Sequence, residues 1–268
     1  VSSTTIDSPI TTSLQASIAI GNGAWDPKTI VGDATVHEDG SVFFEVPARR
    51  AIYFQLLDEN YRALQTMRSF TGLMPGERRG CVGCHEMQSV TPPPQPSIAL
   101  RRPPTPISPP PWGDESIGYE KFVQPVLDRY CGDCHQGDGD ARAELDLTLR
   151  PATGAFREHV FKEPYLTLVG SAAWLKGYAA WIDVGEVANP DRAGYGLAGA
   201  LPVETMTPGI DDPEELATLR PMRFLSYRSP LIDLVSSGKH HDVRVDPLSL
   251  RRLIAWVDAT CPYLGEEE

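Results

Sequence analysis

Long apolar runs are missing from this 268-residue sequence, and so is any excess of basic residues. No stretch approaches the roughly 18 consecutive apolar residues typical of a membrane-spanning helix. Lysine and arginine number 24 against 36 aspartates and glutamates, a formal net charge of −12. Proteins that bind nucleic acid need a basic face for the phosphates, so the charge argues against that class of partner. An acidic protein instead attracts basic partners, and salt weakens the attraction.

The sequence also has no carboxylate pair, serine triad or phosphate-binding loop that would indicate hydrolytic or nucleotide chemistry. Cysteine and histidine are scarce, with five and six residues, yet four of the cysteines fall in two copies of one pattern. This Cys-x-x-Cys-His pattern is typical of c-type haem attachment, in which the thiols add to the haem vinyl groups and the imidazole binds iron. The residues concerned are Cys81, Cys84 and His85 in the first copy, and Cys131, Cys134 and His135 in the second.

A bare Cys-x-x-Cys also fits a zinc knuckle, a thioredoxin-like redox pair or a short disulfide. A thioredoxin motif opens a helix after a strand, and neither copy has that context. A shared four-cysteine zinc site remains an alternative, although zinc does not need a histidine directly after each second cysteine. We therefore predict two covalently bound haem c groups. Because haem is attached to such motifs outside the cytoplasm, we expect a periplasmic or extracellular location, with a signal peptide removed or lying outside this sequence.

The N-terminal part, residues 1–90, has a β pattern around and after residue 30. Residues before that are rich in Ser, Thr and Ile without a clear period, and we expect their ends to be mobile unless docked. Asp39-Gly40, followed by an apolar run at 42–46, predicts a tight hairpin. Further strands are predicted at 51–57 and 63–70, joined by a turn. The pattern predicts a small antiparallel β domain that carries the first haem.

Residues 91–113 contain ten prolines, between Pro92 and Pro111. Such a segment cannot form a helix interior or a sheet ladder, and as an extended polyproline helix it would span roughly 60 Å at about 3.1 Å per residue. We predict a linker, either a domain boundary or a strap laid over a surface.

Residues 114–268 show helical periodicity. Apolar side chains recur at helical spacing before the second motif, with Pro125 either kinking this helix or lying near its first turn. Asp246-Pro247 predicts the start of another helix, as an N-cap followed by proline. Shorter helices are expected near 165–169 and 230–236. The sequence thus predicts an α+β protein whose second part is a mainly α-helical, cytochrome c-like domain.

Several segments, in the same order, resemble the hydrazine synthase alpha subunit and its multihaem relatives in planctomycetes. The segments similar to its middle domain are residues 38–47, 52–55, 65–69, 75–77 and 81–86. Those similar to its C-terminal haem domain are residues 122–128, 227–231, 240–243, 256–258 and 262–263. The resemblance spans roughly residues 30 to 264. It implies one c-type haem in each domain and two histidine ligands on the second haem iron.

The sequence also departs from that family. The hydrazine synthase alpha subunit has a propeller domain ahead of this region, and nothing here supplies one. In that enzyme the catalytic haem takes as axial ligand a tyrosine four residues after the motif histidine, which frees the histidine for zinc. The corresponding residue here is Ser89, which cannot replace the tyrosine. The departure makes hydrazine synthesis doubtful.

The remaining histidines and methionines are candidates for the sixth iron ligands. For the second haem these are His240, His241 and His159, and the His-x-Asp-Val pattern of the relatives favours His240, with His241 next. Tandem histidines also fit a solvated loop, and a lone histidine is more often a surface or satisfied core residue. For the first haem, His37 and Met67 are weaker candidates, and that iron could also be open or capped by another subunit. Cys261 is expected to be a buried free thiol.

Two functions follow from these observations. The first is a dihaem c-type cytochrome that mediates extracytoplasmic electron transfer, which makes the protein a carrier rather than an enzyme. The alternative is a hydrazine synthase-like haem redox enzyme or enzyme subunit, whose open first haem acts on a small nitrogen or oxygen species. The expected partners are redox proteins or other haem subunits, in a homo-oligomer or a larger assembly onto which the β domain could dock the cytochrome.

Overall fold

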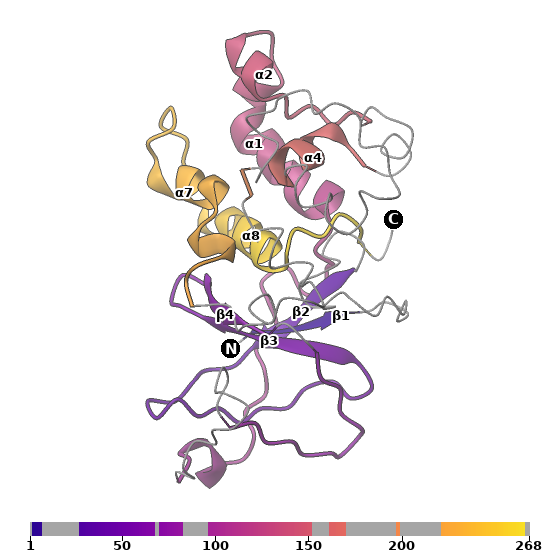
Figure 1. Cartoon of the computed structure of the whole chain (residues 1–268), viewed down its shortest axis with the longest axis vertical. Helices are drawn as coiled ribbons and strands as arrows, with labels where there is room; N and C mark the ends of the chain where they lie inside the picture. The colour runs from indigo at the N-terminus through magenta and orange to yellow at the C-terminus, as the bar shows by residue number, and fades with distance from the viewer. Residues whose placement is uncertain are drawn as a thin grey trace, which may run out of the picture.

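The computed structural model describes residues 2–6, 27–67, 70–82, 96–151, 161–169, 197–198 and 221–265. An antiparallel sheet lies against a group of helices, and helix α8 lies between the sheet and helix α1 (Figure 1). The predicted mixture of antiparallel sheet and helices is therefore confirmed. In the part of the chain that is described, no helix is both long and apolar enough to cross a bilayer.

Four strands form the sheet in the order β2-β1-β3-β4. The strands are β1 (Ser2–Ile6), β2 (Lys28–Asp33), β3 (Ala51–Leu57) and β4 (Ala63–Thr66). No strand is predicted at β1 from the sequence, because its run of Ser, Thr and Ile shows no alternation of apolar and polar residues. In the structure β1 is an inner strand that pairs antiparallel with β2 on one side and β3 on the other. Pairing along both edges thus gives this short segment its conformation.

The predicted strand at 51–57 is confirmed as β3, whereas the strand predicted at 63–70 begins at Ala63 but ends at Thr66. The turn at Asp39-Gly40 is present. His37 N–H donates to the Ser41 carbonyl at 2.9 Å, and Gly40 takes a φ of +78° that favours glycine. The predicted hairpin is nevertheless wrong, because the run at 42–46 forms no strand.

The Pro-rich segment occupies the place that a hairpin partner would take. Thr105 N–H donates to the Phe43 carbonyl at 2.9 Å, and Asp33 and Ser108 exchange both backbone hydrogen bonds, at 2.8 and 2.9 Å. Proline has no N–H to donate, so these bonds use the residues that lie between the prolines. The described part of this segment is a strap along the sheet. The division of the chain into two domains stays a prediction.

The predicted helices are confirmed. A π-helical turn, η2 (Tyr119–Val123), leads into α1 (Gln124–His135), and Pro125 lies in the first turn of α1, as predicted for one of the two alternatives. Helix α8 (Pro247–Asp258) begins after its N-cap Asp246, as predicted. The shorter elements are η1 (Ala99–Arg101), α2 (Asp140–Glu144), α4 (Glu163–Val169), η4 (Leu225–Tyr227) and α7 (Pro230–Ser237).

An aromatic cluster fills the core between the helices. Trp256 of α8 lies against Tyr119, with ring centroids 5.7 Å apart, and its Nε1 donates to the Pro262 carbonyl at 3.0 Å. Tyr165 is fully buried and donates to the Cys261 carbonyl at 2.9 Å. Cys261 is a buried free thiol, as predicted, and burial raises its pKa well above the ordinary value. The buried Trp256 indole and Tyr165 hydroxyl thus each have an acceptor, as a low-dielectric core requires.

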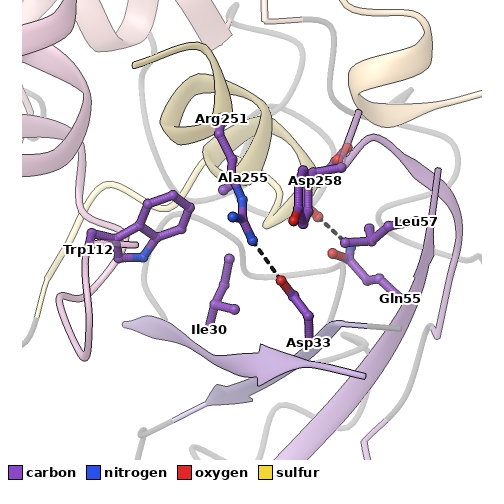
Figure 2. Close-up of a pocket in the computed structure, with 9 residues that line it drawn as sticks. Ile30, Asp33, Gln55, Leu57, Trp112, Arg251, Ala255 and Asp258 are labelled. Carbon is purple, nitrogen blue, oxygen red and sulfur yellow. Dashed lines mark hydrogen bonds and ion pairs between the residues drawn. The ribbon is translucent and has the colours of Figure 1, made fainter. Parts of the chain in front are cut away.

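Buried polar side chains join the sheet to the C-terminal end of α8. The Asp258 carboxylate accepts hydrogen bonds from the N–H and hydroxyl of Ser226, at 2.8 and 2.9 Å, and from the Ala63 N–H of β4 at 2.9 Å. Gln55 of β3 donates to the Asp258 carbonyl at 2.8 Å (Figure 2). The Lys28 ammonium of β2 is fully buried and donates to the Ala259 carbonyl at 2.8 Å. Three strands are thereby fixed to one helix end.

This arrangement predicts that the protein loses stability as the pH rises. Burial raises the pKa of Asp258 from 3.8 to about 7, and the hydrogen bonds from Ser226 and Ala63 only partly oppose the shift. The folded protein therefore holds this proton more tightly than the unfolded chain. The free energy of unfolding should fall between about pH 4 and pH 7, by at most about 4 kcal/mol.

Thermal unfolding midpoints measured across this pH range test the prediction. The Asp258→Asn variant has no titrating proton at this position. Its thermal midpoint should therefore fall less steeply with rising pH than that of wild type. Midpoints that fall in parallel for wild type and Asp258→Asn would show that another group causes the pH dependence.

Candidate functional site

The second cysteine-histidine motif lies in the last turns of α1. Cys131, Cys134 and His135 have the spacing i, i+3 and i+4, which places their side chains on one face of a helix. Buried Val126 and Leu127, five and four residues before Cys131, hold α1 against the core. Cys134 is exposed, whereas burial, together with the neighbouring Cys134 thiol, raises the pKa of the partly buried Cys131 to about 11. Two thiols and one imidazole are thus presented together at the end of a fixed helix.

The imidazole of His135 is oriented by the chain that follows it. Its Nδ1 lies 2.9 Å from the Leu145 carbonyl oxygen and 3.1 Å from that of Ala141. Both partners can only accept, so Nδ1 carries the proton and Nε2 keeps its lone pair. A backbone carbonyl on one ring nitrogen is the usual arrangement for a histidine that binds metal through the other. Because the acceptors are main-chain atoms, no residue type in the sequence marks them.

His240 faces His135 from the loop after α7. The two ring centroids are 6.0 Å apart and the ring planes differ by 17°. An imidazole nitrogen binds a metal ion at about 2 Å and lies about 1 Å from the centroid of its own ring. If two imidazoles bind one ion from opposite sides, their ring centroids are therefore about 6 Å apart. The fold therefore brings together two histidines that are far apart in the sequence, with a centroid separation compatible with one shared iron.

The loop conformation distinguishes the two tandem histidines. Gly238 ends α7 in the left-handed region, and His241 and Asp242 have φ values of 48° and 56°. The His241 ring is exposed and lies nearly perpendicular to that of His240, at 79°. Partial burial, with smaller contributions from His241 and His135, lowers the pKa of His240 below its ordinary value of 6.5. Neutral imidazole, the form that binds metal, therefore predominates at His240 at neutral pH.

The cavity between the sheet and α8 is a different feature. Arg251 and Asp33 form an ion pair of 2.6 Å inside it, Tyr61 and Trp112 flank the guanidinium, and Asp258 contributes to the wall (Figure 2). The space open to the centre of a water molecule is about 20 Å³, room for about one water and far too little for a porphyrin. This cavity is part of the packing between sheet and helix.

Of the other predicted ligands, the structure describes His37 and Met67, which have different neighbours. Cys84, His85 and His159 lie outside the described residues, so the first motif is represented by Cys81, which is exposed. His37 is half-buried in the turn before Ser41. The Met67 sulfur accepts a hydrogen bond from the Phe54 N–H at 3.4 Å. The sulfur is thus engaged with strand β3.

The residues of the second motif fit a c-type haem. Two thiols stand one helical turn apart beside an imidazole whose Nε2 is available, and a second imidazole faces the first at the separation of an axial pair. Among the described residues, no group of three or more His, Cys, Asp or Glu side chains is arranged to hold a bare metal ion. This donor set is compatible with an iron that also binds a porphyrin.

Comparison with known proteins gives one match. Residues 2–86 match the family model of the hydrazine synthase alpha subunit middle domain, about a third of the chain. Neither the curated proteins nor the solved structures gave a match. The matched region contains all four strands and reaches past the first motif histidine. The resemblance of residues after 113 to a haem domain stays a prediction. The N-terminal third of this chain is related to the middle domain of the hydrazine synthase alpha subunit.

Proposed function

We propose that the protein is a dihaem c-type cytochrome that transfers electrons outside the cytoplasm. One haem is bound at Cys81, Cys84 and His85, and the other at Cys131, Cys134 and His135. The observation that carries the proposal is the placement of His240 opposite His135, with ring centroids 6.0 Å apart. An iron with two strong protein ligands has no position for substrate and reorganises little when its charge changes.

The chain's own residues supply attachment and orientation in this proposal. Cys131 and Cys134 would hold the porphyrin covalently, and His135 and His240 would bind its iron. The bound haem supplies the one-electron change at iron. The Leu145 carbonyl fixes the His135 tautomer and makes the imidazole a stronger donor, which favours the oxidised iron.

The partner and the compartment follow from charge and attachment chemistry. A net charge of −12 favours basic redox partners, whose association salt would weaken. The family relation of residues 2–86 suggests a haem-associated subunit, so other haem subunits are also suitable partners. Covalent haem attachment supports a periplasmic or extracellular location.

One observation favours a second candidate function, an enzyme subunit. The matched family domain carries the name of a hydrazine synthase subunit, and residues 2–86 include the first motif. A first haem without a sixth protein ligand could bind a small nitrogen or oxygen species. Ser89 does not supply the tyrosine ligand of that enzyme, and His37 and Met67 are the remaining candidates for closing the site.

The cofactor content is directly measurable. The mass of the intact protein should exceed that of the bare chain by two haem groups, and Cys131→Ser with Cys134→Ser should remove one of them. The paramagnetic resonance spectrum of the oxidised wild type should contain two low-spin signals. A colourless protein with the mass of the bare chain would refute the proposal. A high-spin component that binds carbon monoxide after reduction would favour the enzyme subunit.

The tandem histidines provide a matched pair of variants. His240→Ala should turn the second haem from low-spin to high-spin, because it removes the ligand that faces His135. His241→Ala should leave the spectrum unchanged, because that ring is exposed and lies at 79° to the His240 ring. An unchanged spectrum for His240→Ala, or a high-spin signal for His241→Ala alone, would contradict the assignment of His240.

A further inference from the structure

The loop that carries His240 is joined to α1 by one strong side-chain contact. The Tyr130 hydroxyl, directly before the second motif, donates to the Asp246 carboxylate at 2.5 Å. We infer that Tyr130 and Asp246 are positioning residues that hold His240 against His135 and so keep the second iron six-coordinate. This inference rests on the proposed function, because it assigns a role to residues around the second haem.

The carboxylate of Asp246 makes two separate sets of contacts. Its Oδ1 accepts from the N–H groups of Leu248 and Ser249, at 2.9 and 3.1 Å, and thereby caps α8. Its Oδ2 accepts from Tyr130 and from the Ser249 hydroxyl, the latter at 2.6 Å. Hydrogen bonds from Ser249 and Tyr130 hold the pKa of Asp246 well below its ordinary value, so the bond to Tyr130 is charge-assisted. One oxygen therefore serves the helix and the other reaches α1.

The position of this contact determines what it controls. The loop leaves α7 at Gly238 and enters α8 at Asp246, and His240 lies between these two ends. Within this loop, the Val243 N–H donates a hydrogen bond to the His240 carbonyl at 2.9 Å and closes a turn. Tyr130 lies on α1 one helical turn before Cys134, and its ring packs against the core. The contact thus sets the distance from the helix that carries His135 to the loop that carries His240.

The other two contacts between α1 and Asp246 are weak. The Asp246 N–H donates to the Tyr130 hydroxyl at a long 3.4 Å. Arg129 lies 3.9 Å from Oδ2, but its side chain is 70% exposed. Exposed ion pairs of this kind contribute little to stability. Tyr130 therefore provides most of the attachment, and removing its hydroxyl is the appropriate test.

Tyr130→Phe removes the contact and keeps the ring. In the intact dihaem protein, the rate at which carbon monoxide binds the reduced second haem should rise about tenfold, as expected when a hydrogen bond to a charged group is lost. The spectrum of the carbon monoxide adduct of His240→Ala identifies the signal of the second haem. Ser249→Ala is the matched control, because it removes another hydrogen bond to the same oxygen without affecting α1. Its rate should equal that of wild type.

Asp246→Ser provides an independent test. Serine is a good N-cap but is too short to reach Tyr130, so α8 keeps its cap and loses the short side-chain contact with Tyr130. The long backbone bond from the N–H of residue 246 to the Tyr130 hydroxyl, at 3.4 Å, is all that remains. Asp246→Ser should match Tyr130→Phe in carbon monoxide binding while its thermal midpoint stays near that of wild type. Wild-type rates in both variants would overturn the inference while leaving the proposed function intact. A wild-type protein without haem, or with a second haem that is already high-spin, would overturn the proposed function as well.

Discussion

Helix α8 is the element on which the described structure depends, because polar groups along its length hold three different parts of the chain. Its N-cap, Asp246, contacts α1 through Tyr130, and Arg251 in its middle pairs with Asp33 of β2 at 2.6 Å. At its end, the buried Asp258 carboxylate accepts from Ala63 of β4. A buried carboxylate is costly to leave unsatisfied, so these partners must be in place together. The sheet, the attachment helix and the histidine loop therefore share one support.

This shared support connects the fold to the proposed chemistry. The Cys-x-x-Cys-His motif supplies an attachment point and one axial ligand from a single stretch of helix. The opposite ligand has to come from a distant segment, held at a fixed separation by the rest of the protein. In this chain the separation between His135 and His240 is 6.0 Å, on a scaffold of α1, α7 and α8. A rigid frame of this kind suits electron transfer, in which an iron that keeps its ligands reorganises little.

The sheet has a related but separate role. Residues 2–86 are related to a hydrazine synthase domain, and their four strands are closed on one side by α8 and crossed by the strap of residues 96–113. This arrangement explains why Lys28 and Gln55 are buried although both are polar, since each donates to a carbonyl at the end of α8. The first motif, at residues 81–85, lies at the end of this matched region. The chain that leads to the proposed first haem site thus comes from the same sheet that α8 supports.

The sequence alone determined the local features of this protein. Helical periodicity and the Asp246-Pro247 signal gave the helices, β-branched runs gave β3 and the start of β4, and cysteine spacing gave the haem motifs. These features depend on neighbours within a few residues. Only the tertiary structure decided that β1 is an inner strand, that the strap replaces the hairpin partner at 42–46, and that Asp258 is buried. It also brought His240, and not His241, to His135. Each of these depends on a partner far away in the sequence, and contacts at that range leave no pattern in the local order of residues.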